Sequence, residues 1–292
     1  MRILISSLPK SGWWHSGIPK YPDNPAMKEG AIPNKSVIEI ERQTLIDIIK
    51  HEGHEIVEIT FPETLDARDL KHDFVFVRDQ FITDQKGKAI ILRAGEPSRR
   101  IENIEMDRLL SQMDLEIHHI PDVPGVRADG GEFYYCAADN VLFSGMQRNT
   151  QPGIDAVADI MDVNELVILN GSGYHLDTFF TPVLGADGKI CSLIICKSIL
   201  TEPSLKDLND YVSSANIPVF DIPIQDAIGT VDRIGSFAAN ALPLPGVLIG
   251  PNHFTDRTID NQLAELGVKR IVTPTTQFEL SGGSVHCITN EL

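Results

Sequence analysis

Short apolar runs alternate with amphipathic stretches along this chain, and they recur in one order. In the clearest copy, which opens at Arg78-Asp79, residues 80–83 and 88–92 have the composition of strands and residues 84–87 that of a turn. A helix and a third strand over 115–120 complete the unit. The helix is expected to bury one face, formed by Ile101, Ile104, Leu109 and Met113.

The same order of elements returns three times. Later copies begin at Gly131-Glu132, at Asp177 and near Ser236, so the four starts at 79, 132, 177 and 236 are 53, 45 and 59 residues apart, a period typical of repeat architectures. In the fourth copy, a turn is expected from Pro243 to Gly246. The predicted strands of these copies cover residues 133–136, 141–144, 166–169, 190–196, 218–222, 247–249 and 270–273.

The two ends of the chain together supply a fifth copy. A hairpin opens at Gly283-Ser284, while the N-terminal part provides strands over 2–6 and 55–60 and a helix between them with Ile38, Leu45, Ile48 and Ile49 on one face. We therefore predict an α/β fold, a five-bladed α/β propeller of repeated ββαβ modules in a pseudo-fivefold ring closed by the two termini. Residues 1–292 then form a single domain. The competing interpretation is an ordinary α/β domain without repeats.

The charge of the chain makes some classes of binding partner unfavourable. A net charge of −16 and a pI near 4.9 oppose binding to nucleic acid or to anionic lipid. The apolar start is too short for a signal peptide and no later run is long enough to span a membrane, so we expect a cytoplasmic protein. The four cysteines show no CxxC spacing, which argues for free thiols rather than disulfides or a zinc site. The oligomeric state is left open, with a homodimer as one option.

Chemically active side chains fall at equivalent places in the repeat, at or just before the first strand of a unit. In a ring, such positions face the axis, so residues distant in sequence are expected to converge on one central pocket. The fourth unit offers only Ser236 and Asn240. The other units place there Asp79, Asp129, His175 with Asp177, and Cys287.

Cys287 is the candidate nucleophile, because the other three cysteines lie within apolar runs that indicate core positions. A thiol with an ordinary pKa is mostly protonated at neutral pH, and His175 is its natural proton carrier. The aspartates would crowd the pocket with negative charge unless a cation is bound, and a planar guanidinium suits carboxylates best. A divalent metal is the alternative, although a thiol and an imidazole are poor company for magnesium or calcium.

The motifs around these residues resemble those of the guanidino-group-modifying superfamily. This superfamily has the five-bladed pentein fold and includes arginine deiminase, dimethylarginine dimethylaminohydrolase, agmatine deiminase and glycine amidinotransferase. The similar segments, in the superfamily's order, are Phe76-Val-Arg-Asp79, Pro97-Ser-Arg-Arg-Ile-Glu102, Asp129-Gly-Gly-Glu132, Gly145-Met-Gln-Arg-Asn-Thr150, His175-Leu-Asp-Thr178 and Gly282-Gly-Ser-Val-His-Cys-Ile-Thr-Asn290.

The resemblance implies a role for each matched residue. Cys287 would attack the guanidinium carbon to form a covalent thiouronium, and His175 would protonate the departing amine and then deprotonate water. Asp129 belongs with these catalytic residues and, with Asp79, would orient the guanidinium nitrogens. Asp177 would bind the same group, and Arg148, or less strongly Arg99, would bind the substrate's carboxylate. No metal or organic cofactor is implied; the expected partner is a small-molecule guanidino compound.

Two departures leave the substrate open. Asp129 stands where hydrolases of this superfamily usually carry Glu, and the chain length is closer to the dimethylarginine hydrolases, whereas the string His175 to Thr178 favours a deiminase. We expect a citrulline-forming hydrolase of arginine or an N-substituted arginine. An amidinotransferase and a non-catalytic pentein binding protein are the alternatives. A papain-like protease is disfavoured because there the cysteine precedes the histidine.

Overall fold

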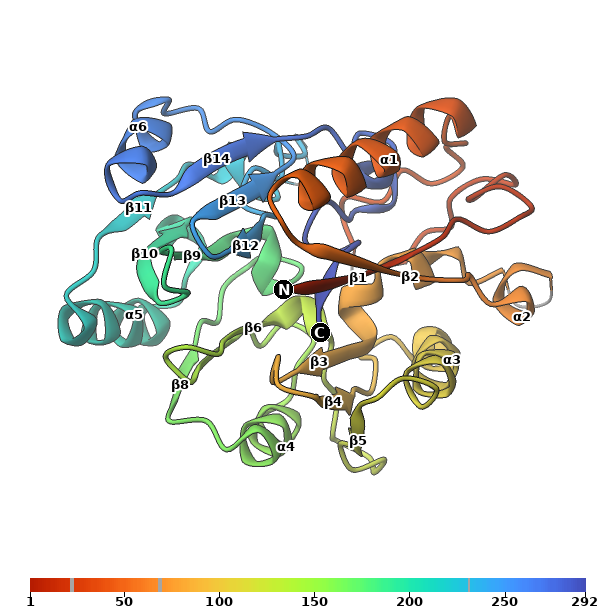
Figure 1. The fold of residues 1–292 in the computed structure, drawn as a ribbon, viewed down its shortest axis with the longest axis horizontal. Coiled ribbons are helices and arrows are strands. Elements are labelled where there is room, and N and C mark those ends of the chain that lie inside the picture. Colours follow the sequence, from red (N-terminus) through yellow and green to blue (C-terminus); the bar gives the residue numbers. More distant parts are fainter. Residues whose placement is uncertain (22–23, 68–69, 231) are drawn as a thin grey trace.

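The computed structural model describes residues 1–21, 24–67, 70–230 and 232–292. Its described part contains five three-stranded sheets arranged around a common centre, with helices outside them (Figure 1). In spatial order, the sheets are β15 (Asn290–Glu291), β1 (Arg2–Ser6), β2 (Glu55–Ile59); β3 (Phe81–Thr83), β4 (Lys88–Ile91), β5 (Glu116–His119); β6 (Phe133–Cys136), β7 (Val141–Ser144), β8 (Glu165–Ile168); β9 (Phe180–Leu184), β10 (Ile190–Ile195), β11 (Val219–Asp221); and β12 (Leu242–Leu244), β13 (Val247–Gly250), β14 (Lys269–Val272).

Each sheet is built by the same sequence of connections. The first two strands pair antiparallel, and the middle strand then pairs with the third in parallel, as in β6–β7 (Phe133 opposite Ser144) and β7–β8 (Val141 opposite Glu165). A parallel pair needs a crossover, which an α-helix provides in every module. The crossover helices are α1 (Lys35–His51), α3 (Arg100–Leu110), α4 (Gln151–Met161), α5 (Glu202–Ala215) and α6 (Thr258–Glu265), and a further short helix, α2, covers Glu63–Ala67. The predicted ββαβ repeat is confirmed.

The two ends of the chain share one module, as predicted. Strand β15 pairs antiparallel with β1, with Leu4 opposite Asn290, and β1 pairs in parallel with β2. Both termini therefore lie close together near the centre of the molecule (Figure 1). The C-terminal residues that carry the candidate nucleophile are fixed in place by strand pairing with the first residues of the chain.

Local sequence signals define the helices. Asn34 caps α1, since its side chain accepts a hydrogen bond from the backbone N–H of Val37 at 3.2 Å. Helices α4 and α5 each begin with a proline in the first turn and end at a residue in the left-handed conformation, Asp162 and Asn216. Apolar faces of the helices pack on the sheets; Ile154 and Val157 of α4, for example, are fully buried.

Two local predictions were wrong. Ile104 is 64% exposed, because α3 turns Glu102, Asn103, Met106 and Leu110 inward instead. Pro243 lies in strand β12 opposite Leu248, not in a turn. β12 is the edge strand of its sheet, where the missing N–H of proline is tolerated. Among the described residues, no helix has the length and apolar character needed to cross a membrane.

Candidate active site

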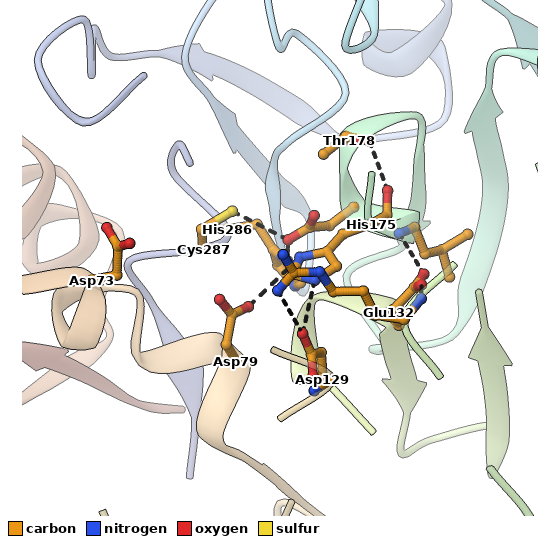
Figure 2. A network of polar contacts seen from close by, with 12 residues as sticks. Asp73, Asp79, Asp129, Glu132, His175, Thr178, His286 and Cys287 are labelled. Carbon is orange, nitrogen blue, oxygen red and sulfur yellow. Dashed lines mark hydrogen bonds and ion pairs between the residues drawn. The ribbon is translucent and has the colours of Figure 1, made fainter. Parts of the chain in front are cut away.

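Single helical turns precede the first strand in three modules and carry the predicted site residues. Asp79 lies in the turn Val77–Gln80 before β3, and Asp129 directly precedes the turn Gly130–Glu132 before β6. His175 directly precedes the turn Leu176–Thr178 before β9, a turn that contains Asp177. The equivalent positions predicted from the repeat therefore converge near the centre of the ring (Figure 2).

Four of the seven predicted site residues line one cavity: Cys287, His175, Asp79 and Arg99. Asp129, Asp177 and Arg148 are buried next to these residues rather than on the cavity wall. Among the described residues, the lining comprises Tyr21, Asn24, Asp73, Phe76, Asp79, Arg99, Tyr174, His175, Thr178, Ser281, Gly282, Gly283 and Cys287.

His175 is held between two carboxylates. Its Nε2 lies 3.2 Å from Asp129 Oδ2, and its Nδ1 lies 3.7 Å from Asp79 Oδ1. Burial alone would lower the pKa of His175, but the negative charge of Asp79 and the hydrogen bond to Asp129 outweigh burial and raise it. The Tyr174 ring stacks on the imidazole at 4.2 Å. His175 is therefore positioned, and electrostatically prepared, to carry a proton at neutral pH.

The backbone at Gly131 makes room for this imidazole. A Cβ atom at Gly131 would lie 2.5 Å from His175 Nδ1 and 3.1 Å from Asp79 Oδ1. Only glycine fits such a close approach. The Gly-Gly pair in the third similar segment therefore lets the Asp129 turn approach His175 closely.

Asp129 also binds Arg148 and the backbone. Its Oδ2 accepts a hydrogen bond from Arg148 Nη1 at 3.1 Å, and its Oδ1 accepts one from the N–H of Gly95 at 2.6 Å. Burial would raise the pKa of Asp129, but the hydrogen bond from His175 and the charge of Arg148 outweigh it and hold the pKa well below its usual range. Asp129 is thus a permanent anion that faces a histidine and an arginine. The Arg148 guanidinium lies over the Tyr174 ring at 4.3 Å.

Arg99 joins Asp79 to the base of α3. Its Nη1 donates to Asp79 Oδ2 at 2.7 Å, and its Nε and Nη2 donate to Glu102, with Nη2 at 2.7 Å from Oε2. Burial raises the pKa of Glu102 to about 7 although Arg99 opposes the rise. This ion-pair chain explains why α3 turns the polar residue Glu102 inward. The other oxygen of Asp79, Oδ1, has no hydrogen-bond partner among the described residues.

Cys287 contacts Asp177 and Asn240. Its Sγ lies 3.4 Å from Asp177 Oδ2 and accepts a hydrogen bond from Asn240 Nδ2 at 3.2 Å. Burial, followed by the charges of Asp177 and Asp79, raises the pKa of the thiol well above its ordinary value. Burial also raises the pKa of Asp177 to about 7. Asn240, the polar residue of the fourth unit, thus completes the set that the repeat predicted.

Sequence reasoning missed three residues that shape the site. Asp73 lines the cavity and accepts hydrogen bonds from Trp14 Nε1 at 3.2 Å and Ser281 Oγ at 2.9 Å. Glu132 is fully buried and accepts the backbone N–H groups of Arg148 and Leu176, tying two loops together. His286 contacts Asp177. Glu132 and His286 lie within the motifs quoted above. Asp73 lies outside them, and its position six residues before Asp79 is its one sequence feature that relates it to the site.

No family model matches this sequence. A segment of 106 residues is 31% identical to an uncharacterised protein of Aeropyrum pernix, and 128 residues are 28% identical to the bifunctional arginine dihydrolase/ornithine cyclodeaminase ArgZ of Synechocystis. The matches cover 36% and 44% of this chain. They cover only 38% of the first relative and 16% of the second, so the chain spans well under two thirds of the curated relatives it matches.

Solved structures cover the whole chain. The N-terminal domain of ArgZ, a cyanobacterial arginine dihydrolase bound to substrate, superposes with a TM-score of 0.79 at 22% identity, over 99% of this chain and 96% of that one. A dimethylarginine dimethylaminohydrolase superposes with a TM-score of 0.69 at 16% identity, over 100% and 99%. This chain has the pentein fold. Its pentein neighbours are guanidino-modifying enzymes, and their resemblance at this identity establishes the architecture.

Nothing in the pentein ring described here is arranged as a metal site. Across residues 1–21, 24–67, 70–230 and 232–292, no group of three or more His, Cys, Asp or Glu side chains is placed to hold an ion. The acids are instead hydrogen-bonded to arginine, histidine, serine, tryptophan and backbone N–H groups.

Proposed function

We propose that this protein hydrolyses a guanidino C–N bond of arginine, or of a close relative, and forms citrulline through a covalent thiouronium on Cys287. One observation carries the proposal: the Cys287 thiol and His175, whose pKa is raised, line the same cavity, beside Asp79 and Asp177, each with one buried oxygen that has no hydrogen-bond partner among the described residues. The arginine-directed neighbours of the same fold support the substrate class.

A guanidinium would supply positive charge and N–H donors to the carboxylates of the site. Asp79 Oδ1 and Asp177 Oδ1 are buried oxygens without a hydrogen-bond partner among the described residues. An unpaired buried carboxylate oxygen is destabilising, and it becomes favourable when a charged N–H donor reaches it. A guanidinium has five such donors in one plane and can serve carboxylates on two of its edges. We therefore assign Asp79 and Asp177 to the two sides of the substrate's guanidinium.

The same cation would activate the nucleophile. In the empty site, burial and two acids keep the Cys287 thiol protonated. A bound positive charge offsets Asp177 and Asp79 and lowers the pKa of the thiol, so that its proton can leave to solvent. Binding and activation are then one event. The thiolate forms only when a substrate cation is in the cavity.

The reaction follows in two halves. In the first, the Sγ–C bond forms, the bond from that carbon to the terminal nitrogen breaks, and His175 donates its proton so that ammonia departs. In the second, water adds to the thiouronium carbon and gives one proton to His175. The C–S bond then breaks, the hydroxyl proton is released as the ureido carbonyl forms, and the thiolate regains a proton. Arginine and water become citrulline and ammonium.

Asp177 favours an unmethylated guanidinium. Methyl groups replace N–H donors, and on the Asp177 side they would leave Oδ1 buried and without a partner. Sites built around a buried hydrogen bond reject analogues that lack it. We therefore place arginine ahead of dimethylarginine. For the α-carboxylate, the proposed partners are Arg99, which lines the cavity, and Arg148, which lies behind Tyr174.

The test is a citrulline assay with arginine, monomethylarginine, dimethylarginine and agmatine, with identification of the released amine. Cys287→Ala should abolish turnover, and Cys191→Ala, which removes a half-buried thiol of another module, should not. Quenched wild-type enzyme should carry the amidino adduct on the peptide that contains Cys287. A wild-type protein inert on all four compounds, or activity that survives Cys287→Ala, would overturn the proposal. Adding glycine as an amine acceptor distinguishes the two reactions: an amidinotransferase would pass the amidino group to glycine, whereas a hydrolase would still form citrulline.

A further inference from the structure

A second histidine lies directly behind the reactive thiol. His286 is fully buried, and its Nδ1 lies 2.8 Å from Asp177 Oδ2 (Figure 2). Its ring stacks on Tyr134 at 4.2 Å with an interplanar angle of 26°. Its backbone N–H donates to Asn240 Oδ1 at 3.0 Å. The imidazole is thus fixed by a ring stack, a backbone hydrogen bond and a carboxylate, without being part of the cavity wall.

The two carboxylate oxygens of Asp177 have different contacts. Oδ2 receives both His286 Nδ1 and the thiol of Cys287, at 2.8 and 3.4 Å. Oδ1 is buried and has no hydrogen-bond partner among the described residues. A carboxylate held at one oxygen by two donors cannot rotate freely, so its second oxygen keeps one direction. His286 provides the shorter of the two contacts that fix this orientation.

We propose that His286 is a positioning residue, whose Nδ1–H holds Asp177 so that the oxygen not shared with the thiol stays available to the substrate cation. This inference rests on the proposed function, because it assigns His286 a role in binding the guanidinium. It makes His286 different from His175, which exchanges protons with the reacting atoms. His286 acts only through Asp177.

The protonation state of His286 fits this role. Burial, with the positive charges of Arg78 and His175, lowers the pKa of His286 well below its ordinary value, so the ring is neutral and carries its one proton toward Asp177. The charged or titratable groups that act on Asp177 are His175, Asp79, Cys287 and Arg78. A neutral donor stabilises the ionised carboxylate without adding a competing cation beside the substrate.

Two substitutions separate the hydrogen bond from the volume of the ring. His286→Asn keeps an N–H donor close to the position of Nδ1, and His286→Leu removes the donor while it fills similar space. With arginine, His286→Leu should lower kcat/KM by about tenfold to a hundredfold, since a buried charged acceptor loses a donor. In His286→Leu, the acid limb of the pH profile of kcat/KM should move to higher pH, because Asp177 then takes a proton more readily. His286→Asn should stay within about threefold of wild type and keep the wild-type profile.

A readout without turnover makes the inference independent of the reaction. The rate of iodoacetamide alkylation at Cys287, mapped by mass spectrometry, is measured against pH in the three proteins. In His286→Leu, a protonated Asp177 no longer opposes the thiolate, so the alkylation profile should move to lower pH. In His286→Asn it should overlay wild type. Thermal unfolding identifies the variants that retain the fold.

The outcomes are distinguishable. A folded His286→Leu protein with wild-type kcat/KM and alkylation profile overturns the positioning role. A His286→Asn variant as impaired as His286→Leu also overturns it, because ring packing would then explain the loss. If wild type turns over none of the guanidino compounds, the proposed function fails, and the alkylation profiles still decide whether His286 controls Asp177. A shift in His286→Leu that His286→Asn does not share supports the inference.

Discussion

Removing the charge of Asp129 should disable His175 without removing it. Asp129→Asn preserves the shape of the side chain, and Oδ1 can still accept the backbone N–H of Gly95. The oxygen that lies 3.2 Å from His175 Nε2 becomes an amide N–H₂ or a neutral carbonyl. A positive imidazolium then loses its closest anion, while Arg148 stays nearby and repels it.

The size of the effect follows from the distance. Two unit charges about 3 Å apart interact by roughly 5 kcal/mol at an effective dielectric constant of about 20. If relaxation removes about half of this, roughly 3 kcal/mol remains, which is about two pKa units. The pKa of His175 then falls by that amount from its raised value. At a pH above both pKa values the protonated fraction drops by roughly a hundredfold, and kcat/KM should fall by about 10², the scale of general acid catalysis.

The sign of the pH dependence is the sharper test. His175 must be protonated to release the amine, so activity is lost as pH rises through its pKa, and a lower pKa moves the alkaline limb of kcat/KM down by about two units. The assay is citrulline formation between pH 5 and 10. Asp122→Asn is the matched control, because this aspartate is 89% exposed and pairs with Arg93 away from the cavity. A folded Asp129→Asn enzyme with an unmoved alkaline limb would refute the assignment of His175 as the acid.

Three further changes test neighbouring claims. Gly131→Ala should reduce kcat/KM by at least about a hundredfold, since its Cβ would sit 2.5 Å from His175 Nδ1. Gly185→Ala should remain active in the same assay, because its Cβ would lie 3.2 Å from Oδ1 of Asp187, an exposed side chain that can move. Asp79→Asn should raise KM for arginine and lower kcat/KM by roughly 10²-fold, and an unchanged KM in steady-state kinetics would contradict its role in binding. Leu142→Ala, at a fully buried position of β7, should lower the free energy of unfolding in urea by about 2–5 kcal/mol, and a change below about 1 kcal/mol would show that the site repacks.

Much of the architecture could be predicted from the sequence because each module repeats the same hydrophobic periodicity. Strands over 133–136 and 141–144 are found with the predicted bounds, since tight turns and apolar runs define them locally. The face of α3 could not be predicted in this way. Hydrophobic periodicity placed Ile104 in the core, but the fold buries Glu102 because Arg99 needs its carboxylate. At this helix, a buried ion pair overrides the amphipathic pattern.

Site residues at equivalent positions of the repeat could be predicted from the sequence. Site residues outside those positions could not. Cys287 and His175 meet in one cavity because both precede the first strand of a module. Asp73 precedes its module by a further turn, and its partners Trp14 and Ser281 come from distant segments. No local pattern announces such a contact. Likewise, nothing in the sequence indicates that Arg99 is bound to Asp79, which only the folded ion-pair chain reveals.

The distribution of partners among the acids explains how a pocket so rich in carboxylates can exist. Asp129 is paired with Arg148, and Asp79 shares Arg99. Asp73 and Asp177 form no ion pair with Arg or Lys in the described part of the chain; serine and tryptophan hold the first, and a neutral histidine holds the second. Burial raises the pKa of both, so protons can take the place of a cation while the cavity is empty. On the proposed function, a guanidinium would enter by displacing protons, and its affinity should weaken as the pH falls below about 7, where Asp177 becomes protonated.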